Sequence, residues 1–271
     1  RCPWHGWDFD PITGKSPGGY GDGLTTYPVE EREDGVYIAV ARDEAHERTN
    51  ADVIADTLVN WGVTQYFGMV GHSNLGMADA LRRKEEAGEI RFFGIRHEGA
   101  AAFACSAYGK LTGKPAASFT IAGPGATNLL TGLYDAKVDR APMIALSGQV
   151  DTQVLGPGAF QEVDLIGAFK DVSAFNHTVY NDSKHGELVS LAVKNALLTR
   201  NPVTLVLPDE VQETPNPEGE TGTPEGRLAN LEIAPATSAL EAALAKIRAA
   251  QRPIIIVGHG ARFLMEAIAA F

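Results

Sequence analysis

The sequence predicts an α/β protein with a doubly wound parallel sheet, preceded by a small N-terminal antiparallel β segment. From Asn50 onward, short apolar runs alternate with helix-like stretches of about ten to fifteen residues, and parallel strands need such helical crossovers. By contrast, residues 1–42 are rich in glycine, proline, tryptophan and tyrosine, with short alternating runs such as residues 36–40. That composition is typical of short strands joined by turns.

Local signals justify each element of the α/β part. Asn50 is a plausible N-cap for a first helix, which carries Trp61 near its end and stops at Gly62. Further strands are expected where apolar runs are short, and further helices where mixed stretches are longer. We expect strands over residues 66–70, 90–95, 116–121, 143–147 and 203–207, and helices over residues 75–87, 98–111, 125–136 and 185–199.

Composition also divides the chain into domains. We expect a β segment over residues 1–42, an α/β domain over 50–211, a proline- and glycine-rich linker over 212–235, and the opening of a second α/β domain over 236–271.

Within the last of these parts, residues 239–250 have the pattern of an amphipathic helix and residues 253–257 that of a buried strand. The chain starts at Arg1 and stops inside an apolar, helix-like run. We therefore expect a fragment cut at both ends.

The overall balance of residues excludes several classes of protein. The 23 basic and 34 acidic residues give a formal charge of -11, which disfavours a nucleic-acid partner. No apolar run approaches the roughly 20 residues of a transmembrane helix. Cys2 and Cys105 are too few for a disulfide framework, so a cytoplasmic protein is expected. Cys105 sits among small helical residues and is expected to be a packed core thiol.

The N-terminal string CPWHGWDFD places Cys2 and His5 in a tight aromatic loop. A thiolate and an imidazole at this spacing could each bind a metal, or could occur together by chance in a surface turn. The whole string resembles the second half of a Rieske [2Fe-2S] motif, and residues 10–40 resemble the closing strands of such domains. The resemblance implies that Cys2 ligates one iron and His5 the other. A [2Fe-2S] cluster is expected only if an upstream C-x-H pair, which this sequence lacks, supplies the remaining ligands.

A second chemical candidate is Glu98, which follows an apolar run and begins a helix of small residues. A carboxylate there stabilises the helix dipole, and this structural role alone would explain it. The alanines behind it would also allow another helix or subunit to approach closely.

Four motifs carry a more specific signal. They are YFGMVG at 66–71, RHEGAAAFACSAYGKLTGKP at 96–115, IAGPGATNLLTGLYDAKVDRAPMIALSG at 121–148 and FQEVD at 160–164. In this order and spacing they resemble the pyrimidine-binding domain of thiamine diphosphate enzymes of the pyruvate oxidase and acetolactate synthase group.

This resemblance implies a role for each matching residue. Glu98 would hydrogen-bond N1′ of the aminopyrimidine and so promote loss of the C2 proton of thiamine diphosphate. The cofactor-binding residues would be Gly71, Gly123, Pro124, Gly125 and Asn128, and the substrate-side residues His72, Phe160 and Gln161. A tight turn would equally explain residues 123–125, which are called the glycine loop below. Loop packing would explain Phe160 and Gln161. His97 is expected to be structural.

The expected function is therefore that of the N-terminal part of a thiamine diphosphate-dependent enzyme that decarboxylates a 2-keto acid. Its expected type is pyruvate oxidase or dehydrogenase-like, with the Rieske segment relaying electrons. Two alternatives stay open: an acetolactate synthase-type carboligase, and an inactive binding or assembly fragment. The resemblance further implies a homodimer or tetramer formed through the pyrimidine-binding domain, Mg²⁺ bound by a missing C-terminal domain, and a possible FAD. Residues 1–271 alone are expected to be inactive.

Overall fold

The computed structural model describes residues 9–10, 12–15, 26–38, 46–230 and 233–271. The chain divides into two compact units, Arg1–Pro224 and Glu225–Phe271. Cys2 and His5, the predicted iron ligands, lie outside the described residues. Among the described residues, every helix is too short or too polar to cross a bilayer.

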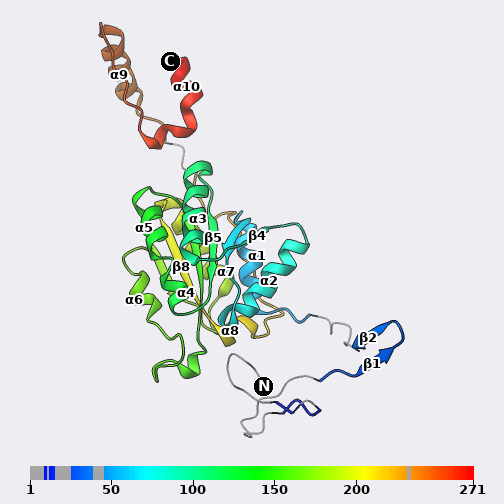
Figure 1. Cartoon of the computed structure of the whole chain (residues 1–271). Helices are drawn as coiled ribbons and strands as arrows, with labels where there is room; N and C mark the ends of the chain where they lie inside the picture. The colour runs from blue at the N-terminus through cyan, green and yellow to red at the C-terminus, as the bar shows by residue number, and fades with distance from the viewer. Residues whose placement is uncertain (1–8, 11, 16–25, 39–45, 231–232) are drawn as a thin grey trace. The chain divides into compact units, whose positions relative to one another are not determined.

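A six-stranded, wholly parallel sheet forms the core of the first unit (Figure 1). In spatial order its strands are β4 (Arg91–Gly94), β3 (Gln65–Gly68), β5 (Ala116–Thr120), β6 (Met143–Gln149), β8 (Pro202–Pro208) and β7 (Phe175–Thr178). The three central strands β5, β6 and β8 are buried along their whole length. Such burial is expected of parallel strands covered on both faces. The predicted doubly wound α/β fold is confirmed.

Helices cover both faces of this sheet (Figure 1). They are α1 (Asn50–Asn60), α2 (Leu75–Glu86), α3 (Glu98–Thr112), α4 (Pro124–Thr127), α5 (Leu130–Val138), α6 (Leu165–Phe169), α7 (His185–Thr199) and α8 (Asp209–Glu213). Helices α3, α5 and α6 contribute to one apolar core with Met143 and Ala145 of β6, while α1 packs against α7. Helices α3 and α5 can approach closely because Gly132 has no side chain. A Cβ there would lie only 2.4 Å from Ala102 Cβ.

Two short strands form the N-terminal β segment. Strand β1 (Val29–Arg32) pairs antiparallel with β2 (Gly35–Ile38), and all eight residues are exposed. This confirms the small antiparallel β structure predicted for the beginning of the chain.

Three local predictions differ from the structure. The N-cap of α1 is Thr49, which forms a capping box with Asp52, while Asn50 is the first helical residue and is buried. The Asn50 side chain donates to the backbone oxygen of Val211 at 3.0 Å. The helix predicted over 125–136 is split into α4 and α5, and strand β7 was not predicted.

The strand predicted over residues 253–257 is wrong. In the second unit, which contains α9 (Thr237–Ala249), a 3-10 helix (His259–Leu264) and α10 (Met265–Ala270), these residues form no strand. Ile254 and Ile256 are 88% and 93% exposed. A strand needs a neighbour for its backbone N–H and C=O groups, and no described strand pairs with this run.

The predicted linker over 212–235 is not uniform. Gln212 is 1% exposed and donates through Nε2 to the backbone oxygens of Ser73 and Leu207. The backbone N–H of Gly222 donates to Thr57 Oγ1 in α1 at 3.1 Å. Residues 212–224 therefore belong to the first unit, whose boundary falls at Pro224, because their backbone groups are paired there.

Replacing Thr57 by valine tests this packing. Valine preserves the shape of threonine but leaves the buried N–H of Gly222 without an acceptor. We expect the free energy of unfolding to fall by about 1–3 kcal/mol, as measured by denaturant titration. Thr199→Val is the matched control. Thr57 Oγ1 and Thr199 Oγ1 each donate to the backbone oxygen four residues earlier, but Thr199 lies on an exposed surface. Equal stabilities of the two variants would contradict the packing role.

Candidate functional site

The topology of the sheet indicates where a ligand would bind. Strand β3 lies between β4 and β5, so the chain leaves β3 first to one side and then returns to the other. In open parallel sheets, ligands bind at such a switch point, outside the carboxyl ends of the strands. Gly71, Glu98 and Gly123 occupy the segments that directly follow β3, β4 and β5. The predicted site residues therefore meet at this edge.

Glu98 is the first residue of α3 and is 8% exposed. Its Oε2 accepts a hydrogen bond from Asn128 Nδ2 at 3.0 Å. Its Oε1 faces the next glycine loop, since a Cβ at Gly125 would lie 3.2 Å from it. The preceding residue, His97, is the N-cap of α3, and its Nδ1 accepts from the backbone N–H of Gly99 at 3.1 Å. His97 thus has a structural role beside the carboxylate.

Gly123 of the glycine loop has a backbone conformation that residues with a side chain rarely adopt. Gly123 has φ +64° and ψ -128°, and a Cβ there would lie 2.6 Å from the backbone oxygen of Gln161. Gly71 and Gly125 both approach Ile121: a Cβ on either would lie 2.6 Å from the Ile121 side chain. Ile121 is therefore a central residue of the site. Sequence reasoning missed it, although its position two residues before Gly123 was a usable signal.

Phe160 and Gln161 come to this edge on a loop with unusual backbone geometry. Gln161 has φ +69° and its backbone lies against Gly123, while Phe160 is 89% exposed. The loop is organised by Glu162, whose carboxylate accepts from the backbone N–H groups of Gly156, Gly158 and Ala159 at 2.7–2.9 Å. Glu162 is a second residue that sequence reasoning missed, because these contacts depend on the loop's fold.

Protonation of Glu162 should loosen this loop. The backbone N–H of Gly156, followed by that of Ala159, holds the pKa of the Glu162 carboxyl below its usual 4.5. Because the folded pKa is lowered, its stabilisation is complete above pH 4.5 and is lost as the pH falls through the folded value. We expect the amide NMR resonances of Gly156 and Gly158 to shift below that pH. Glu162→Gln should remove this titration; an unchanged titration in the variant would contradict the assignment.

His72 lies at the same edge but faces solvent. Its side chain is 91% exposed, and Nδ1 lies 3.6 Å from Asp209 Oδ2. Burial raises the pKa of the Asp209 carboxyl, against the opposing effect of His72. Cys105, by contrast, is fully buried, and burial raises the pKa of its thiol. It is the packed core thiol that the sequence predicts, and it takes no part in the site.

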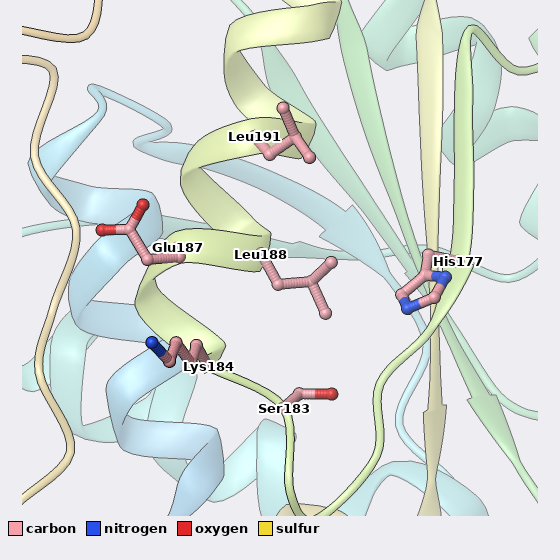
Figure 2. Close-up of a pocket in the computed structure, with 6 residues that line it drawn as sticks. All are labelled: His177, Ser183, Lys184, Glu187, Leu188 and Leu191. Atoms are coloured by element: carbon pink, nitrogen blue, oxygen red, sulfur yellow. The ribbon is translucent and has the colours of Figure 1, made fainter.

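A hollow lies beside β7, the strand at one lateral side of the sheet. This cavity of about 420 Å³ lies between β7 and α7 and is lined by His177, Ser183, Lys184, Glu187, Leu188 and Leu191. Figure 2 shows Leu188 pointing toward His177, while the charged ends of Lys184 and Glu187 turn away from the hollow. It shares no residue with the Glu98 site. Within the described ranges, no group of three or more His, Cys, Asp or Glu is placed to hold a metal.

Part of the first unit matches a known family profile. Residues 48–168 match the family profile described as thiamine pyrophosphate enzyme, N-terminal TPP binding domain. This match confirms the resemblance to thiamine diphosphate enzymes for that range, which contains Glu98 and the glycine loop.

Several curated relatives are similar to the chain. An acetolactate synthase from Arthrospira platensis is 39% identical over 60% of the chain and 28% of the relative. An acetolactate synthase large subunit from Parasynechococcus marenigrum is 36% identical over 79% of the chain and 35% of the relative. A Bacillus subtilis protein, YdaP, whose name describes it as thiamine pyrophosphate-containing, is 36% identical over 79% of the chain and 37% of the relative. The chain thus spans about a third of the length of these relatives.

Proposed function

Because residues 48–168 match the profile of the N-terminal TPP binding domain of thiamine pyrophosphate enzymes, we propose that the full-length protein is an acetolactate synthase-type carboligase. It would decarboxylate pyruvate or a similar 2-keto acid and join the remaining two-carbon unit to a second keto acid. The acetolactate synthase relatives favour this alternative over the pyruvate oxidase type that the sequence analysis placed first.

One observation carries the proposal: a buried carboxylate that lies directly against a glycine of the loop at residues 123–125. Glu98 is 8% exposed, and its Oε1 lies where a Cβ on Gly125 would almost touch it. A flat heterocycle with a ring nitrogen suits such a carboxylate, because a carboxyl group that is largely shielded from water can share a proton with the ring nitrogen. The residues present therefore fit the aminopyrimidine of thiamine diphosphate.

Each predicted residue has a place in this proposal. Bound thiamine diphosphate supplies the electron sink for decarboxylation. Glu98 holds the shared proton at Oε1, while Gly71, Gly123, Pro124 and Gly125 let the ring approach the backbone. His72, Phe160 and Gln161 would border the substrate, and Phe160, being 89% exposed, is free to contact it. The Mg²⁺ and diphosphate would be bound by parts of the protein that lie outside this chain.

A dimer formed by the same domain is also proposed. Helices α3 and α5 leave four large apolar side chains exposed, which are Phe103, Leu111, Tyr134 and Val138. An exposed apolar face of this kind supports association with a second copy. We further propose that residues 236–271, which contain α9 and α10, open a second domain.

A second candidate is an oxidative enzyme of the pyruvate oxidase or dehydrogenase type, with FAD or a Rieske cluster as electron acceptor. The string CPWHGWDFD favours it, with Cys2 and His5 as iron ligands, and the β1–β2 hairpin is of the kind expected after such a motif. Iron and acid-labile sulfide analysis of the full-length protein tests the cluster directly.

The deciding experiment uses the full-length protein with thiamine diphosphate, Mg²⁺ and pyruvate. We expect acetolactate to form without an electron acceptor. Acceptor-dependent oxidation of pyruvate without acetolactate would overturn the carboligase in favour of the second candidate. Residues 1–271 alone should show no turnover, and activity of this fragment would refute the proposed division of the site.

A further inference from the structure

The residue that fixes the proposed catalytic carboxylate is Asn128. Its side-chain amide is the one side-chain hydrogen-bond donor to Glu98 among the residues that the structure describes, with 3.0 Å between Nδ2 and Oε2. The two residues are 30 positions apart in the sequence. Family resemblance groups Asn128 with the glycine loop as a cofactor-binding residue, but the structure aims its amide at the protein's own glutamate.

The backbone of Asn128 makes one hydrogen bond and lies close to α3. It ends α4, and its N–H donates to the Pro124 oxygen at 3.0 Å. Its own backbone oxygen lies close to the start of α3, since a Cβ on Gly99 would be 3.3 Å from it. This hydrogen bond anchors the backbone from which the amide reaches Glu98, although Asn128 itself is exposed.

This contact distinguishes the two oxygens of the carboxylate. Donation by an amide N–H to a carboxylate is a charge-assisted hydrogen bond, so Oε2 is engaged. Oε1 lies on the side of Gly125. A carboxylate free to rotate would spend part of its time in other orientations and lose alignment with a reaction partner.

We propose that Asn128 is a positioning residue, which acts on the reaction through Glu98 by holding Oε2 and presenting Oε1, and does not itself bind the cofactor. This inference rests on the proposed function. It predicts that the effect of Asn128 depends on Glu98, whereas a direct cofactor contact would act independently of it.

The test is a double-mutant cycle in the full-length protein, with Asn128→Ala, Glu98→Gln and the double variant. Asn128→Ala should lower kcat about tenfold, the kinetic equivalent of one hydrogen bond, with KM for pyruvate little changed. In the Glu98→Gln background it should change kcat by less than about twofold. Asn128→Asp, which removes the donor and adds a second negative charge, should be impaired at least as much as Asn128→Ala.

A binding measurement separates the two roles without relying on turnover. The Kd for thiamine diphosphate, measured by fluorescence titration, should be the same for Glu98→Gln and for the double variant. A further loss of affinity on removing Asn128, or full additivity of the kcat effects, would overturn the proposal. Asn195→Ala is the matched control, because the Asn195 amide donates to a carbonyl oxygen within α7; an equal effect of that change would also overturn it.

The outcome is distinguishable from failure of the proposed function. If the wild-type protein forms no acetolactate, or if Glu98→Gln is fully active, the proposed function fails first. If both behave as expected and Asn128→Ala retains wild-type kcat, only the positioning role is refuted.

Discussion

Replacing Glu98 by glutamine in the full-length protein should lower kcat by about 10²–10⁴-fold, the usual contribution of a positioned proton-transfer group. Glutamine keeps the length and shape of the side chain and can still accept from Asn128, so the fold should be preserved. It cannot share a proton with a ring nitrogen as a carboxyl does. The measurement is acetolactate formation, together with the rate of hydrogen–deuterium exchange at C2 of the bound cofactor.

The control for this variant is Glu86→Gln. Glu86 is an exposed residue at the end of α2 and pairs with Arg82 at the surface, where such pairs contribute little. It should retain wild-type exchange and turnover. Near-normal C2 exchange in Glu98→Gln would remove Glu98 from its proposed role and with it the main support for the carboligase.

Adding one methyl group at Gly123 should have the largest effect on stability. Alanine would adopt a backbone conformation at φ +64° and ψ -128° that is nearly exclusive to glycine, and its Cβ would lie 2.6 Å from the Gln161 backbone oxygen. Strain and overpacking together should lower the free energy of unfolding by about 2–5 kcal/mol. Denaturant titration measures this loss, and binding of thiamine diphosphate should weaken because Gln161 must move.

Gly88→Ala separates strain from collision. Gly88 also has a positive φ, +74°, but a Cβ there would meet nothing within 4 Å. Its cost should be limited to the left-handed conformation, about 1–2 kcal/mol. If Gly123→Ala were no more destabilising than Gly88→Ala, the close packing of the Gln161 loop against the glycine loop would be disproved.

Sequence reasoning found the fully buried strands β5, β6 and β8, and also β3 and β4, which are only partly buried. Strands β5, β6 and β8 are mostly apolar, as expected of strands that helices cover on both faces. Strand β7 was missed because the polar residues Asn176 and His177 interrupt it, whereas the other edge strand, β4, has the apolar pair Phe92 and Phe93 at its centre. The apolar run at 253–257 led to a wrong strand prediction, because hydrophobicity does not reveal whether a partner strand is present.

The candidate site shows the same division. Glu98, Gly123 and Gly125 were predicted because their motifs are contiguous in the sequence and resemble a known family. The Asn128–Glu98 hydrogen bond joins different helices, and the three bonds to Glu162 depend on the path of one loop. No residue pattern encodes such pairings visibly. Tertiary contacts of this kind became evident only in the folded chain.

The two ends of the α/β domain are tied to each other. Thr49 and Pro215 form an isolated antiparallel bridge, the N–H of Asn50 donates to the Thr214 oxygen and that of Asn216 to the Arg48 oxygen. Entry and exit of the polypeptide therefore lie side by side, the arrangement that tolerates domain insertion and circular permutation. The domain could therefore be placed between unrelated flanking domains without changing the sheet edge that carries Glu98.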